Sequence, residues 1–120
     1  MPQSLGTLIV PLLDAQTVDE TASTPLNLTG YAAATIYVSG AGTITSGVVT
    51  IEEAYIPART EAAGYTGTWS SITTVTASDV SGGAQQAVHL PLGAYNFVRT
   101  RISTAIGGGG SISTALVAVA

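Results

Sequence analysis

The chain has 120 residues, which is enough for one hydrophobic core and too few for two ordinary domains. Charged residues make up only 8% of the chain, against about 25% in a typical globular domain. Small and hydroxylated residues replace them, with 18 Thr, 11 Ser, 18 Ala and 14 Gly. The apolar content of 46% excludes a disordered chain, and the scarcity of Glu, Lys and Arg excludes a coiled coil.

The charge balance limits the possible partners. The chain has three arginines, no lysine and seven acidic residues, so its net charge is -4 at pH 7. Three arginines cannot neutralise a row of phosphates or hold an anionic membrane, so we expect no nucleic-acid partner and no membrane partner. The absence of cysteine excludes a disulfide framework and a thiolate zinc site. The apolar run 7–13 has no preceding basic residue, so we expect no signal peptide.

The N-terminal residues differ from the rest because Pro2, Pro11 and Pro25 interrupt them. Proline lacks an N–H donor and suits extended or edge segments. We predict an extended arm over residues 1–28, with an edge strand at 7–13, and a β-sandwich domain over residues 29–120. The arm could donate a strand to a neighbouring molecule, and residues 1–13 could then be deleted without unfolding the sandwich. Equally, the stretch could be the first strand of its own domain.

Beyond residue 30 the sequence becomes a series of short strand-like runs separated by glycine. Residues 31–38 alternate with a period of two, which is typical of a strand with two usable faces. Similar runs lie at residues 48–56, 68–76, 86–92, 95–102 and 111–119. This spacing predicts an all-β protein, an antiparallel β-sandwich or jelly-roll-like domain of about eight strands. Residues 57–64 begin with proline and end with glycine, which fits a short helix or a plain loop.

Catalytic signatures are missing from the sequence. The single histidine, His89, falls in a predicted strand, and no G-x-S-x-G nucleophile motif occurs. Glu52 and Glu53 are adjacent, so on a strand they point to opposite faces and cannot flank one bond. No Asp-x-Asp loop or phosphate-binding glycine loop is present. We therefore expect that the protein is not an enzyme and that it binds no metal and no cofactor.

Two groups of residues are candidates for interfaces instead. Tyr65 and Trp69 lie close to Arg59 in the sequence, and exposed aromatic and arginine side chains often anchor interfaces. The alternative for Trp69 is the buried core tryptophan of a sandwich. Arg99 and Arg101 share one strand face, either toward solvent or against a carboxylate of a partner subunit.

The low charge predicts an oligomer or a component of a larger assembly, because a free monomer usually has a far more charged surface. The apolar N-terminal stretch would contribute to such contacts. The candidate residues for capsid or subunit contacts are Leu8, Ile9, Val10, Leu12, Leu13, Arg59, Tyr65, Trp69, Arg99 and Arg101.

Residues 29–119 resemble small β-sandwich proteins of tailed bacteriophages that are encoded among virion structural genes. The resemblance rests on the GTWS segment at 67–70, followed by YNFVRTRI at 95–102. It implies a head decoration (cement) protein, a homotrimer that binds the major capsid protein on the outer capsid surface and stabilises the shell. It also implies synthesis in the host cytoplasm.

Two other functions remain open within the same resemblance. The chain could be a carbohydrate- or receptor-binding module of a tail fibre, with Tyr65 and Trp69 as a platform on which a glycan stacks. It could also be a neck or tail-completion protein, present in a few copies per particle. A glycan partner is expected only in the first case.

Overall fold

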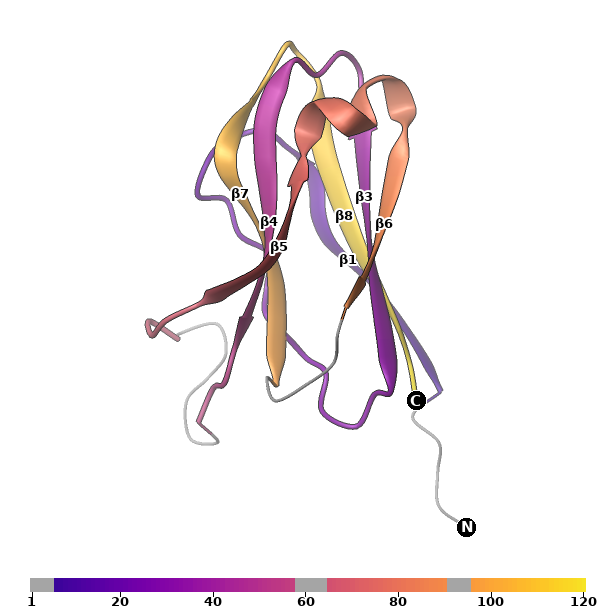
Figure 1. The fold of residues 1–120 in the computed structure, drawn as a ribbon, viewed down its shortest axis with the longest axis vertical. Coiled ribbons are helices and arrows are strands. Elements are labelled where there is room, and N and C mark those ends of the chain that lie inside the picture. The colour runs from indigo at the N-terminus through magenta and orange to yellow at the C-terminus, as the bar shows by residue number, and fades with distance from the viewer. Residues whose placement is uncertain (1–5, 58–64, 91–95) are drawn as a thin grey trace.

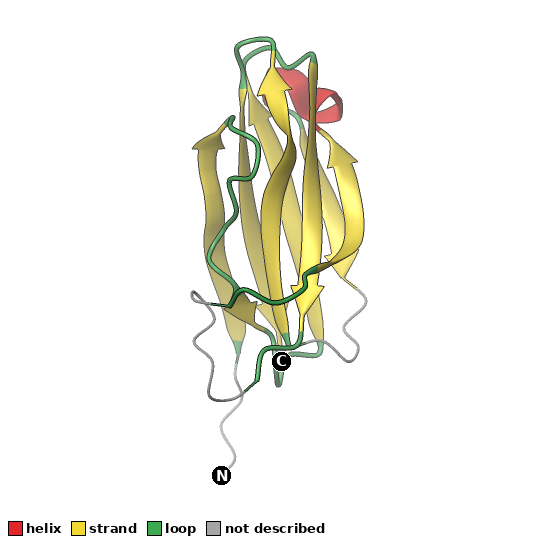
Figure 2. Cartoon of the chain, turned by 90° about the vertical axis from the view of Figure 1, so that its left-hand side faces the viewer, coloured by secondary structure: helices red, strands yellow, loops and turns green. Residues whose placement is uncertain are grey.

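The computed structural model describes residues 6–57, 65–90 and 96–120. It confirms the all-β prediction, and strands fill most of the described chain (Figure 2). The elements are β1 (Thr7–Gln16), β2 (Leu26–Asn27), β3 (Ala33–Ala41), β4 (Ser46–Ala54), β5 (Ser70–Thr76), the 3₁₀ helix η2 (Ala77–Gly83), β6 (Gln85–Leu90), β7 (Phe97–Gly107) and β8 (Ser111–Val119). The predicted helix or loop at 57–64 lies, except for Pro57, outside the described residues.

The strands form two four-stranded antiparallel sheets that pack face to face (Figure 1). Sheet A has the order β1-β8-β3-β6, and sheet B has the order β2-β7-β4-β5. The strands pair like those of one long hairpin: β1 with β8, β2 with β7, β3 with β6 and β4 with β5. This hairpin folds over to form the two sheets. This nested order is that of a jelly roll, so the predicted eight-stranded architecture is confirmed.

The core follows from the period-two pattern of the strands. Alternate side chains of the central strands point between the sheets and are buried there. The fully buried aliphatic residues on these strands are Ile36, Val38, Val49, Ile51, Val98, Ile102, Ile112 and Leu116. The side chains at the alternate positions of these strands therefore face outward and make up the two outer surfaces of the sandwich.

Two buried threonines connect the sheets through the core. The hydroxyl of Thr100 on β7 lies 2.8 Å from the hydroxyl of Thr114 on β8. Thr114 Oγ1 also accepts a hydrogen bond from the backbone N–H of Leu13, at 3.1 Å. Because buried hydroxyls need partners, this arrangement aligns β7, β8 and β1 with one another.

The structure places the apolar N-terminal stretch in its own sheet. β1 pairs with β8 along its length, with register shifts that flank Leu13. The Leu13 side chain is 5% exposed and belongs to the core. Of the two roles left open by the sequence, the stretch takes that of a first strand within the domain. Deleting residues 1–13 would remove most of β1 and this core side chain, so we expect the deletion to destabilise the sandwich instead of leaving it folded.

Residues 17–28 also belong to the sandwich. They run antiparallel along the edge of β7, where the N–H of Glu20 donates to the Ile102 carbonyl at 2.7 Å and the N–H of Leu28 donates to the Asn96 carbonyl at 2.9 Å. Their last residues form β2. The predicted extended arm thus becomes edge structure in both sheets.

The helix η2 was not predicted, because the sequence indicated only a glycine break at 81–83. It connects β5 to β6 at the end of the sandwich away from both termini (Figures 1 and 2). Ala77 and Val80 are buried beneath it. Gly40 on β3 lies so close to η2 that a Cβ there would collide with the carbonyl oxygen of Val80. No helix in the described ranges is long and apolar enough to span a bilayer.

Replacing Leu13 tests the place of β1 in the fold. We expect Leu13→Ala to lower the free energy of unfolding by about 2–5 kcal/mol, because it leaves a cavity in the core. Ile9→Ala on the same strand is the control, since Ile9 is 70% exposed and surface changes usually cost less than about 0.5 kcal/mol. Urea unfolding of both variants checks this, and equal stabilities would contradict the packing of β1.

Candidate functional site

The outer surface of sheet A has an unusual composition. Pairing places its outward side chains in cross-strand rows, such as Ile9, Val117 and Thr35. We call outer face A the surface formed by Thr7, Ile9, Pro11, Ala33, Thr35, Tyr37, Ser39, Gln85, Ala87, His89, Ser113, Ala115, Val117 and Val119. No Asp, Glu, Lys or Arg is among them. Ile9 and Val119 are 70% and 42% exposed. Such a surface is suited to packing against another molecule.

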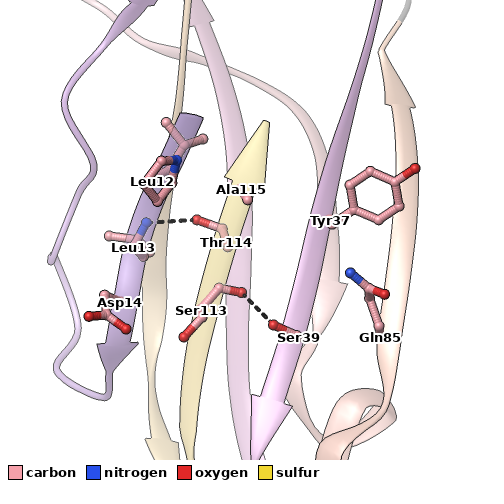
Figure 3. Close-up of a pocket in the computed structure, with 10 residues that line it drawn as sticks. Leu12, Leu13, Asp14, Tyr37, Ser39, Gln85, Ser113, Thr114 and Ala115 are labelled. Carbon is pink, nitrogen blue, oxygen red and sulfur yellow. Dashed lines mark hydrogen bonds between the residues drawn. The ribbon is translucent and has the colours of Figure 1, made fainter. Parts of the chain in front are cut away.

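A groove of about 410 Å³ crosses outer face A (Figure 3). The small residues Ser39, Ser113 and Ala115 lie on the two central strands, while larger side chains such as Leu12 and Gln85 come from the flanking strands. Tyr37 on the central strand β3 is a further large lining residue, so the hollow lies over the small residues and between these larger side chains. Asp14 borders the groove at the end of β1 and is its charged lining residue. A protruding side chain of a partner could insert here.

The outer surface of sheet B carries a buried carboxylate between two arginines. Glu52 on β4 is directly opposite Arg99 on β7, and its side chain is only 7% exposed. Glu52 Oε1 accepts from Arg99 Nε at 3.0 Å and from Arg101 Nε at 3.1 Å. Arg101 Nη1 also donates to Glu20 Oε1 at 2.9 Å. These four side chains balance in charge, as a largely desolvated carboxylate requires.

Arg101 donates a hydrogen bond to Glu52, and this contact raises the pKa of Arg101 above its ordinary value. The negative charges of Glu52 and Glu20 add to the rise. Burial acts in the opposite direction and is outweighed. A raised pKa means that this contact stabilises the fold wherever arginine is protonated and is lost only in strongly alkaline solution. Arg101 is therefore not a pH switch in the physiological range.

Trp69 lies outside the core, on the same surface. The Arg99 Cζ atom is 4.3 Å from the Trp69 ring centroid, which is a cation–π contact. Tyr65 packs against Trp69 edge to face, with ring centroids 5.9 Å apart. The alternative of a buried core tryptophan is thus wrong. Because Arg99 already lies over the Trp69 ring, that ring face is not open for a stacked glycan.

A second pocket, of about 280 Å³, lies beside these aromatic rings. Its walls are residues 22–25, from the segment along the edge of β7, together with Tyr65, Trp69 and Arg99. Within the described residues, the Trp69 Nε1 atom is buried and has no hydrogen-bond partner. Buried N–H groups are normally satisfied, so this atom is an exception in the sandwich.

The predicted interface residues are divided between the two sheets. Tyr65, Trp69, Arg99 and Arg101 come together on sheet B. The five residues from β1 lie in sheet A, where Leu8, Leu12 and Leu13 pack on the core, Val10 is half-buried and Ile9 is exposed. Arg59 is outside the described residues.

The sequence left open whether Arg99 and Arg101 face solvent or a carboxylate of a partner subunit. The carboxylate that they contact is that of Glu52 in the same chain. Sequence reasoning missed this contact because Glu52 and Arg99 are 47 residues apart, and only the β4–β7 register brings them together. His89 is an exposed strand residue whose Nδ1 lies 2.9 Å from Thr35 Oγ1. Over the described ranges, no three acidic, cysteine or histidine side chains gather as a metal site would require.

Removing the Glu52 charge tests the role of the carboxylate. We expect Glu52→Gln to lower the free energy of unfolding by about 1–3 kcal/mol, because two guanidinium groups lose the negative charge that they share. Glu53→Gln is the matched control, since Glu53 is half-buried and makes no ion pair with a described residue. Urea denaturation of both proteins gives the comparison, and a Glu52 variant as stable as the control would refute the role.

Neither a protein-family model nor a curated protein matches this sequence. Among solved structures, the chain is similar to the SPBc2 prophage-derived protein YomS. The two structures superpose with a TM-score of 0.59 at 10% sequence identity, over 95% of this chain and 93% of that one. At this level of identity, the similarity shows a shared fold along nearly the whole length of both chains.

Proposed function

We propose that the protein is a structural component of a phage virion, a decoration (cement) protein that binds the outer surface of the capsid and stabilises the shell. The observation that carries the proposal is outer face A, whose cross-strand rows hold no charged side chain, with Asp14 at the end of β1 as the charged residue that borders them. The shared fold with a prophage-derived protein and the resemblance to phage virion sandwiches support the same origin. The partners proposed are the major capsid protein and further copies of the chain, arranged as homotrimers.

The size of outer face A suits this role. Four strands of about nine residues cover roughly 20 Å by 30 Å, or about 600 Å² in projection. A standard protein interface removes about 800 Å² of accessible surface from each partner. Protruding side chains add accessible area to this projection, so the face supplies most of the surface that one partner contributes to such an interface.

The stabilising effect on the shell would come from mass action. A protein that binds the assembled shell but not free coat subunits lowers the free energy of the assembled state as its concentration rises. With outer face A against the shell, the charged cluster on sheet B points to the solvent. The polar side of the sandwich then keeps the decorated particle hydrated.

A charge placed on outer face A tests the contact. We expect Ile9→Asp to weaken binding to purified empty capsids at least tenfold, because an unpaired carboxylate is buried in the interface. Val18→Asp is the matched control. Val18, like Ile9, is an exposed β-branched apolar residue, but it lies on the segment along the edge of β7. Co-sedimentation with capsids measures both. Equal binding of the two variants would remove outer face A from the proposal.

The copy number in virions tests the location. Quantitative mass spectrometry of particles from the phage that carries this gene should give a number comparable to that of the major capsid protein. A few copies per particle would instead indicate the neck or a tail fibre. Absence from the particle would overturn the structural role.

A further inference from the structure

We propose that the pocket on sheet B between residues 22–25 and the Tyr65–Trp69 pair binds a carboxylate-bearing sugar residue. Arg99 is the anchoring side chain. Arg99 of β7 places the pocket on sheet B. Sheet B packs against sheet A (Figure 1), so the pocket and outer face A can be used at the same time. The inference stands independently of the capsid proposal.

Hydrogen-bond donors without acceptors make the first part of the case. A guanidinium has five N–H donors, and Arg99 uses its Nε to reach Glu52. Within the described part of the chain its two Nη groups have no hydrogen-bond partner, and the side chain is 22% exposed. A pocket that offers donors calls for a ligand with acceptors, and a carboxylate matches the two Nη groups of arginine.

The surrounding charges allow an anion to approach. Glu52 Oε1 is shared between two guanidinium groups and is buried beneath them. Glu20, the other nearby carboxylate, is held by Arg101. The outer end of Arg99 is therefore the positive group that faces the pocket. Its contact with the Trp69 ring fixes its position, so little side-chain freedom is lost when a ligand binds.

The rest of the lining favours a sugar over an acidic peptide side chain. Thr24, an exposed residue, offers a hydroxyl, while Pro25, Tyr65 and Trp69 offer apolar surface. A pyranose ring has both hydroxyls and an apolar face, and aromatic side chains commonly contact that face. The volume of about 280 Å³ is at the low end for ligand pockets and suits a single ring. An Asp or Glu side chain would fill only the end beside Arg99.

The single tryptophan makes the experiment direct, because all indole fluorescence of the chain comes from Trp69. The purified protein is titrated with D-glucuronic acid, D-galacturonic acid and N-acetylneuraminic acid. D-glucose and D-galactose are the neutral controls. We expect a saturable change in Trp69 emission with at least one acidic sugar and none with the neutral sugars. Absence of saturation with all three acids, or equal binding of the neutral sugars, would overturn the proposal.

Three substitutions locate the binding to Arg99. Arg99→Gln should weaken the acidic sugar at least tenfold. Arg101→Gln should change its affinity less than threefold, because Arg101 loses the same Glu52 contact but does not line the pocket. Arg99→Lys keeps the charge and removes the paired Nη donors, so it should give an intermediate loss and covers the case in which the glutamine variant misfolds. Unchanged affinity in both Arg99 variants would refute the assignment.

A blocked acidic amino acid tests whether the pocket binds an acidic protein side chain instead of a sugar. If N-acetylglutamate amide binds as tightly as the best acidic sugar, the pocket accepts a protein side chain and the sugar assignment is wrong. The Ile9→Asp variant should bind the sugar like the unmodified chain, since Ile9 is on sheet A. Failure of the capsid proposal and failure of this one are thus observed in different assays.

Discussion

The carboxylate of Glu52 is the contact on which the polar half of the molecule depends. It holds both arginines of β7 against β4 and so fixes the side chains across the centre of sheet B. Through Arg101 it connects to Glu20 on the segment along the edge of β7, and through Arg99 to the Trp69 ring. Three parts of the chain distant in sequence are therefore positioned by one buried anion. Its charge is acceptable there only because two cations accompany it.

This concentration of charge accounts for the composition. With 8% charged residues the chain cannot surround itself with solvated charge. The arginines that the structure describes are on sheet B, and the outward positions of sheet A hold Ala, Ser, Thr, Val and Ile. The two sheets have the same backbone architecture but different outer chemistry. One outer surface suits contact with another protein, and the other suits water and small polar ligands.

Much of the fold could be predicted from local pattern. Alternation in residues 31–38 and 111–119 identified two strands of sheet A, β3 and β8, since a period of two is visible without knowing the partner strand. The pairing itself could not be predicted, because the contact between Glu52 and Arg99 depends on register between distant segments. Trp69 was assigned to the core as one alternative on the basis of residue type alone. Its position is set instead by Arg99, which local pattern cannot reveal.

The nested pairing of the strands has a consequence for how the chain acquires its structure. Leu13 and Thr114, joined by a hydrogen bond, are 101 residues apart. β1 thus leaves the ribosome long before β8, the strand with which it pairs, and cannot complete its sheet until β8 has been synthesised. Folds dominated by such distant contacts fold slowly. During that delay the apolar face of β1 is uncovered, so Pro11 and the register shifts around Leu13 help to prevent premature pairing with other chains.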